Sequence, residues 1–483
     1  MKRLCLLALM IFVGCKSEFD EFKQKVIDDA KSDQRIDQKE YEELAALAGS
    51  SNDRAFKTFK DGDGRIDNEK LVTYLRKFLD SKKLSSVEIS TGDAAPAPVA
   101  AFNVNVFLEN SASMDGYVKG VTNFETAIYN LLGDIKISGI CDSLNLSYIN
   151  KTIPYQKKNA VSPEIQDFIE KLEPATFRLR GGDRSVSDLK SILNTVLHTV
   201  DNRNAAVLIS DFVFSPGNKA DAQDYLNNQS VGIKIDFAEK LHALDLAAII
   251  VHLESNFDGL YYDKTDKPIQ LSAKRPYYIW IIGTKAQVQE ILQKKIVDNI
   301  KGGYQHKLVL QSIKDAQTPA FKIMYKPQTG HFDAKALPQG IITNASASAE
   351  GKFGFDVAVD FSKGLQDASY FLDPANYVLS NKHYQLTAEL IQDKNNPALK
   401  GFTHLLHIST DQLRDENVEV SVIGRSPSWV DTLSSEDDAN IATDNAEKQR
   451  TFGFKYLLDG VCDAFYPPNT TNTISKFNIQ IKK

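Results

Sequence analysis

Between residues 102 and 297, short continuous apolar runs alternate with segments of helical periodicity. Two of the runs, Ala205–Ile209 and Leu246–Val251, contain no polar residue at all. Strands without a polar face suit a parallel sheet that helices cover on both sides. The sequence therefore predicts a doubly wound α/β domain over 102–302, with functional loops at the carboxyl ends of its strands. The expected strands are 102–108, 144–149, 205–210, 246–253 and 277–283.

Polar residues gather where two of these strands end. The first strand leads into Glu109, Ser111 and Ser113, and a later strand ends at Asp211. The run Gly181-Gly182-Asp183-Arg184-Ser185 precedes a helix. Carboxylate and hydroxyl oxygens are the hard ligands that Mg²⁺ prefers. An alternative is that these residues only cap the elements that follow them.

Residues Phe102–Ile300 resemble a von Willebrand factor A domain in the order of their elements and in motif. The metal-ion-dependent adhesion site of that family uses Asp-x-Ser-x-Ser, a Thr and a later Asp. The resemblance implies a Mg²⁺ site with an open position for a partner's carboxylate. The implied ligands are Glu109, Ser111, Ser113, Asp183 or Ser185 in place of the Thr, and Asp211. Glu109 is one methylene longer than the usual Asp.

Residues 18–80 show helical periodicity, interrupted by two similar segments that contain Ile36 and Ile66. The segments resemble the loops of an EF-hand pair, Asp29–Glu40 and Phe59–Lys70, which implies an EF-hand-like module over 15–83 and Ca²⁺ as its ligand. The implied calcium ligands are Asp29, Asp33, Asp37 and Glu40 in the first loop and Asp61, Asp63 and Asp67 in the second. Each loop departs from the motif, so an alternative is a helical pair that has lost the metal.

The chain begins with two positive charges and an apolar run, Leu4–Val13, that ends at Gly14-Cys15. This arrangement is typical of an export signal, and the run is about half of the ~20 residues that a spanning helix needs. The sequence Phe12-Val13-Gly14-Cys15 resembles the lipobox of bacterial lipoproteins. The resemblance implies a signal peptide over 1–14 and a lipid on Cys15 that anchors the protein in the cell envelope. Lys16 and the acidic residues after it resemble a surface-export signal, which favours the outer membrane.

Two further cysteines, Cys141 and Cys462, lie far apart in the sequence. In an oxidising compartment they could form a disulfide between an early strand and the C-terminal helix. Two free thiols are the alternative, because cysteine behaves as a small apolar residue.

The remaining segments complete the domain organisation. Residues 84–101, with small residues and two prolines, are typical of a linker. Alternating runs over 303–430 predict antiparallel strands in a β-sandwich-like domain. Residues 431–483 contain an acidic loop, an amphipathic helix and a last strand, and we expect the helix to pack back on an earlier domain.

Composition limits the function. The chain is 42% hydrophobic, and its net charge of −6 becomes −8 without Lys2 and Arg3, which argues against non-specific nucleic-acid binding. It contains no G-x-S-x-G elbow, P-loop or dinucleotide fingerprint. We therefore expect a binding module rather than an enzyme: an envelope lipoprotein that binds a protein or glycan partner with a metal ion. The alternatives are a metal-dependent envelope hydrolase and a purely structural subunit of an envelope assembly.

Overall fold

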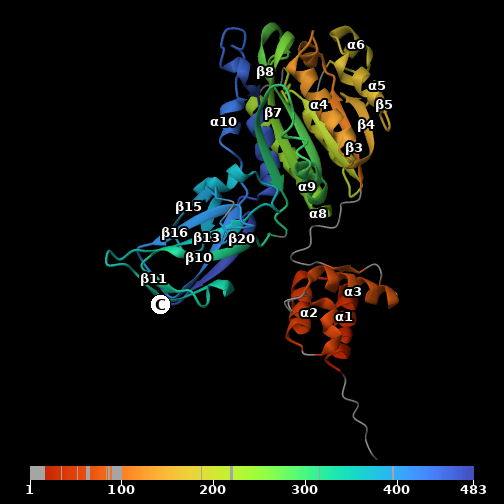
Figure 1. The fold of residues 1–483 in the computed structure, drawn as a ribbon. Helices are drawn as coiled ribbons and strands as arrows, with labels where there is room; N and C mark the ends of the chain where they lie inside the picture. The colour runs from red at the N-terminus through yellow and green to blue at the C-terminus, as the bar shows by residue number, and fades with distance from the viewer. Residues whose placement is uncertain are drawn as a thin grey trace, which may run out of the picture. The chain divides into compact units, whose positions relative to one another are not determined.

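The computed structural model describes residues 17–33, 35–51, 53–60, 66–82, 84, 87–89, 101–185, 188–217, 221–314, 316–393 and 396–483. The chain is a mixed α/β protein with several sheets, and it divides into two compact units, Met1–Val99 and Ala100–Lys483 (Figure 1). The expected signal peptide, Cys15, Asp61 and Asp63 lie outside the described residues. No helix in the described ranges is both long enough and apolar enough to cross a membrane.

The first unit is helical around an aromatic core. Its elements are α1 (Glu18–Asp33), β1 (Arg35–Ile36), α2 (Gln38–Ser50), η1 (Arg54–Phe59), α3 (Asn68–Ser81) and β2 (Glu88–Ile89). Phe22, Phe56 and Phe59 are almost fully buried, and the rings of Phe22 and Phe56 meet edge to face with centroids 5.3 Å apart. Such aromatic pairs contribute ~0.5–1.5 kcal/mol beyond the area they bury.

In the structure, the segment expected to form the first calcium loop, Asp29–Glu40, is arranged differently. Helix α1 continues through Asp33, so Asp29 lies inside a helix, where it forms an ion pair with Lys25 at 3.3 Å. Ile36 pairs with Ile89 of β2 rather than with the second loop. Asp37 and Glu40 form the capping box of α2: the Asp37 carboxylate accepts from the Glu40 amide at 2.8 Å and the Glu40 carboxylate from the Asp37 amide at 2.9 Å. Their oxygens thus serve the backbone of a helix start.

The second unit contains a seven-stranded sheet in the order β5-β4-β3-β6-β8-β7-β9. Its strands are β3 (Phe102–Glu109), β4 (Cys141–Ile149), β5 (Tyr155–Lys157), β6 (Asn204–Ser210), β7 (Leu246–Tyr262), β8 (Pro268–Thr284) and β9 (Tyr304–Gln311). Its helices are η2 (Ala112–Tyr117), α4 (Asn123–Ile137), α5 (Ser162–Ile165), η3 (Gln166–Glu170), α6 (Pro174–Leu179), α7 (Leu189–Thr199), α8 (Ala222–Ala243) and α9 (Lys285–Gln293).

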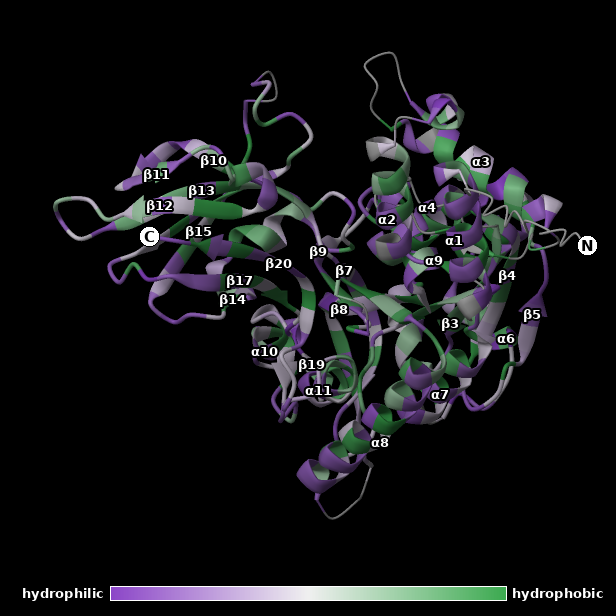
Figure 2. Cartoon of the chain, turned by 90° about the horizontal axis from the view of Figure 1, so that it is seen from below, coloured by the Kyte–Doolittle hydropathy of each residue, from purple (hydrophilic) through white to green (hydrophobic). Residues whose placement is uncertain are grey.

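Helices cover both faces of this sheet. Phe124 of α4 packs on Tyr277 at a centroid distance of 4.9 Å, whereas Phe237 of α8 approaches Trp280 at 6.5 Å. Successive residues of a strand point to opposite faces, so Tyr277 and Trp280 of β8 place these helices on opposite sides. Figure 2 shows hydrophobic residues concentrated along the strands and hydrophilic residues on outer helix turns, as on α8.

The sheet is mixed, which corrects the expectation of parallel strands. Strands β4, β3 and β6 are parallel, but β8 is antiparallel to both β6 and β7, and β9 is antiparallel to β7. No helix separates β7 from β8, and a short connection can join only antiparallel neighbours. A continuous apolar run is buried on both faces in either direction, so the sequence pattern did not reveal this reversal. Strand β9 also extends the sheet beyond the expected domain end at residue 302.

Two smaller sheets form the rest of the second unit, in the orders β10-β13-β16-β15 and β11-β12-β20-β17-β14. Their strands are β10 (Ala320–Thr329), β11 (His331–Asp333), β12 (Ile341–Ser346), β13 (Phe353–Asp360), β14 (Tyr377–Leu379), β15 (Tyr384–Leu390), β16 (His404–Thr410), β17 (Glu416–Ile423) and β20 (Thr473–Ile481). The remaining elements are η4 (Leu337–Gln339), η5 (Ala368–Leu372), η6 (Pro374–Asn376), α10 (Trp429–Leu433), β18 (Ser434–Ser435), η7 (Glu447–Gln449), β19 (Thr451–Phe452) and α11 (Phe454–Phe465). Phe321 of β10 stacks on Phe477 of β20 at 4.7 Å, so aromatic contacts join the two sheets.

Helix α11 lies against the seven-stranded sheet and α8. Phe454 stacks on Tyr278 of β8 at 4.1 Å, and Asp463 forms an ion pair with Lys234 of α8 at 3.0 Å. Cys462 of α11 is buried and Cys141 opens β4, and both are free thiols. Cys141 lies in β4, whereas α11, which contains Cys462, packs on β8. Strands β3 and β6 separate β4 from β8, and at ~4.8 Å between neighbouring strands this exceeds the ~4.4–6.8 Å Cα separation of a disulfide. The structure therefore contains no disulfide between Cys141 and Cys462.

Candidate functional site

The two strand-end carboxylates meet at one edge of the seven-stranded sheet. Strands β3 and β6 are parallel neighbours, and the last residue pair that joins them is Leu108 with Ile209. Glu109 ends β3 and Asp211 follows β6, so both side chains lie at the carboxyl edge. Chain order along the sheet reverses between these two strands. In open α/β sheets such a reversal point is where ligands bind.

Both carboxylates are buried and surrounded by hydroxyl groups. Glu109 is 1% exposed and Asp211 4% exposed. The Ser210 hydroxyl donates to the Glu109 carboxylate, and Asp211 accepts from the Val213 amide at 3.3 Å. Ser113 also bonds to Asp211, and its hydroxyl oxygen lies 3.0 Å from that of Ser111. Four of the residues that the sequence pointed to therefore form one oxygen-rich cluster: Glu109, Ser111, Ser113 and Asp211.

The proximity of the two carboxylates changes the titration of Asp211. Burial, and next the negative charge of Glu109, raise the pKa of Asp211 to about 7, although the Val213 amide, Arg275 and Ser113 act in the opposite direction. Two buried carboxylates cannot both remain charged without a counter-charge. A proton or a cation bound at this edge would supply that charge.

A cavity of about 120 Å³ opens over the cluster. Several waters would fit in that volume, since each needs ~10–15 Å³ of such space. The lining includes Glu109, Ser111, Ser113 and Ser185, so Ser185 from the expected middle motif reaches the same cavity. Tyr261 and Tyr262 from the end of β7 form another wall. All of the acidic and hydroxyl candidates except Asp183 are therefore in or beneath this cavity.

Asp183 lies on the surface, apart from the cluster. Its carboxylate pairs with Lys151 at 2.6 Å and also accepts from Ser185. The bond to Lys151, followed by those to Ser185, holds the pKa of Asp183 below its ordinary value. Between the two residues that could replace the missing Thr, the structure therefore favours Ser185.

Arg184 holds the loop after β3 in place. Its guanidinium donates to the carbonyl of Asn110 at 2.6 Å and to that of Ser111 at 3.0 Å, and it pairs with Asp115. The Ala112 amide returns a bond to the Arg184 carbonyl at 3.1 Å. These contacts bring Ser185 to the cavity, but they also place a positive charge on its wall, which opposes a bound cation. Arg184 stood within the glycine-rich run that the sequence singled out, although its role was not foreseen.

Arg275 of β8 is a second residue that sequence analysis missed. It is 1% exposed, and its Nη1 donates to the carbonyls of Lys448 at 3.0 Å and Arg450 at 2.9 Å. Its guanidinium lies 4.6 Å from the centroid of the Tyr261 ring. Its positive charge partly offsets the negative charge of the ionised Asp211 carboxylate. No sequence signal distinguishes this arginine from a surface one, because the carbonyls that its guanidinium binds lie more than a hundred residues away.

The cluster consists of two carboxylates, Glu109 and Asp211, and the hydroxyls of Ser111 and Ser113. It does not contain the three acidic or histidine side chains of many metal sites. In the part of the chain that the structure describes, no group of three His, Cys, Asp or Glu side chains could hold a metal ion. A site at this edge would thus depend on serine oxygens and water to complete the coordination of a small cation.

Comparisons with protein-family models, with curated proteins and with solved structures return no significant match. The likeness to von Willebrand factor A domains and to EF-hands therefore rests on motif and element order alone. Any function has to be inferred from the geometry of the site itself.

Proposed function

We propose that Glu109, Ser111, Ser113 and Asp211 hold a divalent cation of the Mg²⁺ class, through which the protein binds an acidic group of a protein or glycan partner. The observation that carries this proposal is the pair of buried carboxylates beneath an oxygen-lined cavity. When bound, the cation would neutralise the two acids and offer one coordination position to a partner oxygen. Ser185 would face the partner from the opposite wall.

The donor set fits such a cation. Mg²⁺ prefers hard oxygens and retains several waters. The cavity is lined by the carboxylates of Glu109 and Asp266 and by several hydroxyls, has room for water, and has Asp211 buried next to Glu109. The positive charge of Arg275 offsets part of the charge of Asp211, and Arg184 lines the cavity. We therefore expect an affinity that is modest rather than tight.

Calorimetric titration of Mg²⁺ and Mn²⁺ tests the proposal. We expect binding to the wild type and at least tenfold weaker binding, ~1.4 kcal/mol, to the Asp211→Asn chain. The fold should tolerate this change, because asparagine removes a buried charge repulsion. Asp463→Asn is the matched control, because this partly exposed carboxylate forms an ion pair with Lys234 and does not line the cavity. Equal heats in the wild type and in the Asp211→Asn chain would exclude the metal role.

We extend the proposal to the fold of each part. A von Willebrand factor A-like domain over 102–302 is supported by the strand order, which in chain numbering is 3-2-1-4-6-5-7. The doubly wound order 3-2-1-4-5-6 is the same up to the fourth strand. The departures are β5, which is antiparallel to β4, and β8, which lies antiparallel between β6 and β7. A β-sandwich-like arrangement of the two smaller sheets is supported by the Phe321–Phe477 contact.

We restrict the cation proposal to the second unit. Asp29 lies within α1, and Asp37 and Glu40 cap α2, so the first EF-hand-like loop leaves few oxygens for Ca²⁺. Asp67 likewise caps α3 by accepting from the Lys70 amide at 3.2 Å. An EF-hand-like helical module that has lost its calcium agrees best with these contacts.

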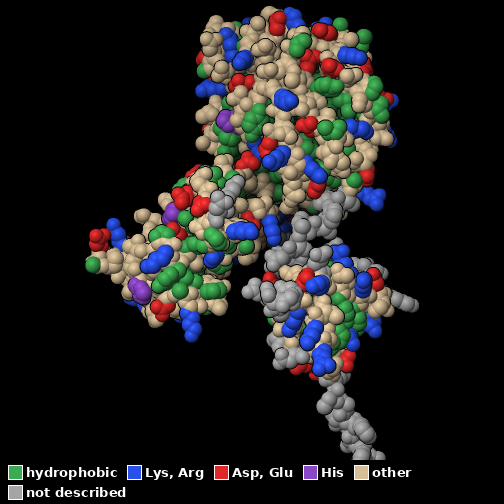
Figure 3. All heavy atoms as spheres, in the orientation of Figure 1, with side chains coloured by type: hydrophobic (Ala, Val, Ile, Leu, Met, Phe, Trp, Pro, Cys, Tyr) green, Lys and Arg blue, Asp and Glu red, His purple; other side chains and the backbone are tan. Residues whose placement is uncertain are grey.

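We also propose that a lipid on Cys15 anchors the protein in the cell envelope, most naturally in the outer membrane. The support is the motif Phe12-Val13-Gly14-Cys15 after a short apolar run. Figure 3 shows charged side chains of both signs interspersed over the visible face of the second unit. That pattern agrees with a protein or glycan partner better than with nucleic acid.

A metal-dependent envelope hydrolase is the second candidate. The cavity over Glu109 favours it, because a cation held there could activate one of the waters for which the cavity has room. Turnover of ester, phosphate or glycan substrates by the wild type, abolished in the Asp211→Asn chain, would decide for the hydrolase.

A further inference from the structure

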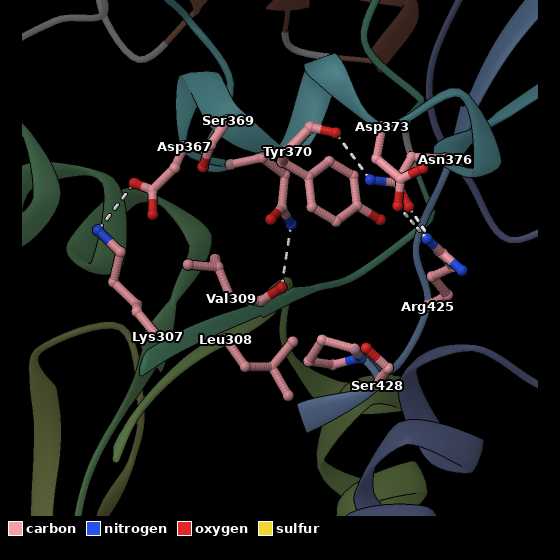
Figure 4. Close-up of a pocket in the computed structure, with 12 residues that line it drawn as sticks. Lys307, Leu308, Val309, Asp367, Ser369, Tyr370, Asp373, Asn376, Arg425 and Ser428 are labelled. Atoms are coloured by element: carbon pink, nitrogen blue, oxygen red, sulfur yellow. Dashed lines mark hydrogen bonds and ion pairs between the residues drawn. The ribbon is translucent and has the colours of Figure 1, made fainter. Parts of the chain in front are cut away.

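A second cavity, of about 230 Å³, lies where the seven-stranded sheet meets the smaller sheets (Figure 4). Strand β9 forms one wall with Leu308 and Val309, and the turn that contains Asp367, Ser369 and Tyr370 forms the opposite wall. The volume is slightly below the ~300–1,000 Å³ of sites for drug-sized ligands. An occupant would therefore be small, about the size of a single ring. The cavity shares no lining residue with the one over Glu109.

Two cationic and two anionic side chains line this cavity, so its lining carries no net charge, and Asp298 adds a third carboxylate from outside the lining. The Lys307 side chain is only 3% exposed and pairs with Asp367 and Asp298 at 2.8 Å each. At the other end, Arg425 pairs with Asp373 at 2.5 Å. An added anion would be repelled by the carboxylates, and an added cation by Lys307 and Arg425. A neutral ligand avoids both penalties.

The polar side chains are held in fixed positions by backbone groups. Gln366 donates its amide to the Val309 carbonyl at 3.0 Å, and Asn376 donates to the Tyr370 carbonyl at 2.7 Å. The Tyr370 hydroxyl donates to the Ile423 carbonyl at 2.6 Å. These bonds connect three distant segments around the cavity, so its shape is formed before any ligand arrives. Preformed sites avoid the entropy cost of ordering on binding.

The lining alternates hydrogen-bonding and apolar groups. Each carboxylate can accept more hydrogen bonds than one ion pair uses, and the serine hydroxyls can both donate and accept. Leu308, Val309 and the ring of Tyr370 supply apolar surface between them. A sugar ring has the complementary pattern, with hydroxyls around its edge and C–H groups on its faces.

We infer that this cavity binds one neutral sugar ring, either free or at the end of a glycan. The ring hydroxyls would donate to Asp367 and Asp373 and accept from Arg425, and a C–H face would pack on Tyr370. This site is independent of the cation site, so either one can fail without the other.

Saturation-transfer NMR on the full chain, with no divalent cation added, tests the inference. The probes are glucose, galactose, mannose and N-acetylglucosamine, with glucuronate and glucosamine as charged analogues, each at a few tens of millimolar. We expect at least one neutral sugar to give a signal, and the charged analogues to bind at least tenfold more weakly. No signal from any neutral sugar, or stronger binding of a charged analogue, would overturn the inference.

Two variants localise the binding. Asp373→Ala removes a hydroxyl acceptor and the ion pair of Arg425, which keeps its bond to Asn376. Ser369→Trp fills the cavity from an exposed position with little effect on the core. Both should lower the affinity at least tenfold. Lys476→Ala is the matched control, because it breaks a similarly exposed ion pair with Glu419, at 3.1 Å, elsewhere in the same domain. Unchanged sugar binding in both cavity variants, with melting temperatures like the control's, would also overturn the inference.

Discussion

Glu125 is an acid that the fold has buried at a helix start. It is 7% exposed, and its carboxylate accepts from the amide of Thr122 at 3.2 Å, which completes the capping box of α4. Burial raises the pKa of Glu125 to about 7, although its bonds with Thr122 act in the opposite direction. Ionisation of this side chain therefore costs more in the folded protein than in the unfolded chain.

This shift predicts a pH dependence of stability with a definite sign. The folded pKa, about 7, is above the ordinary 4.5, so the folded state holds a proton that the unfolded chain releases between these values. Stability should fall as the pH rises through this window. Glutamine keeps the cap and cannot ionise, so Glu125→Gln should be more stable than the wild type at pH 8 and similar at pH 4, as measured by urea unfolding. An equal difference at both pH values would contradict the assigned shift.

Arg275 and Asp211 illustrate how burial changes the role of a polar residue. The sequence placed Asp211 after a strand, and strand-end acids at one sheet edge can be expected to meet. Nothing local in the sequence places Arg275 beneath the same edge, because its contacts with residues 448 and 450 depend on the folded C-terminal segment.

At the scale of elements, α8 and α11 approach each other closely at a glycine. A Cβ atom added to Gly460 of α11 would lie 2.4 Å from the carbonyl oxygen of Ser230 in α8. Gly133 of α4 is a contrasting case, because a Cβ there would meet nothing within 4 Å. Substituting each glycine therefore distinguishes the effect of helix propensity on stability from the effect of packing.

Alanine at these positions should have opposite effects on stability. Gly133→Ala is expected to stabilise by about 0.5–1 kcal/mol through helix propensity alone. Gly460→Ala gains the same propensity, but it should destabilise overall because overpacking costs about 1–3 kcal/mol. Urea unfolding of both chains under one condition measures the difference. Stabilisation by both substitutions would mean that α11 and α8 are not in close contact.

The hairpin of β7 and β8 shows where element-level prediction failed. The apolar runs correctly indicated strands at 246–253 and 277–283. The residues between them were not expected to continue both strands, so the antiparallel return was missed. Direction is decided by the connection and by pairing across the sheet, which strand hydrophobicity does not encode.

At the scale of the whole molecule, the chain consists of two compact units, each with its own buried core. Helix α1 begins at Glu18, three residues after Cys15. If Cys15 carries a lipid, only a short segment separates the membrane from the first unit.

Under the lipid-anchor proposal, replacing Cys15 should release the protein from the membrane. The wild type is expected in the membrane fraction and the Cys15→Ser chain in the soluble envelope fraction, because a lipid chain contributes ~0.8 kcal/mol for each buried CH₂ group. Cys5→Ser, within the apolar run, is the matched control and should remain with the membrane. Fractionation followed by immunoblotting checks this, and a Cys15→Ser chain that stays with the membrane would exclude this anchor.

The sequence by itself predicted five strands of the seven-stranded sheet, the helical first unit and the meeting of Glu109 with Asp211. These follow from local periodicity and from the geometry of parallel strands. Only the tertiary structure shows that β8 lies between β6 and β7, that Arg275 is buried and its charge acts on Asp211, that Asp183 pairs with Lys151 on the surface, and that a cavity forms beside β9. Each of these depends on contacts between residues far apart in the chain, and local sequence patterns carry no record of which distant surfaces will meet.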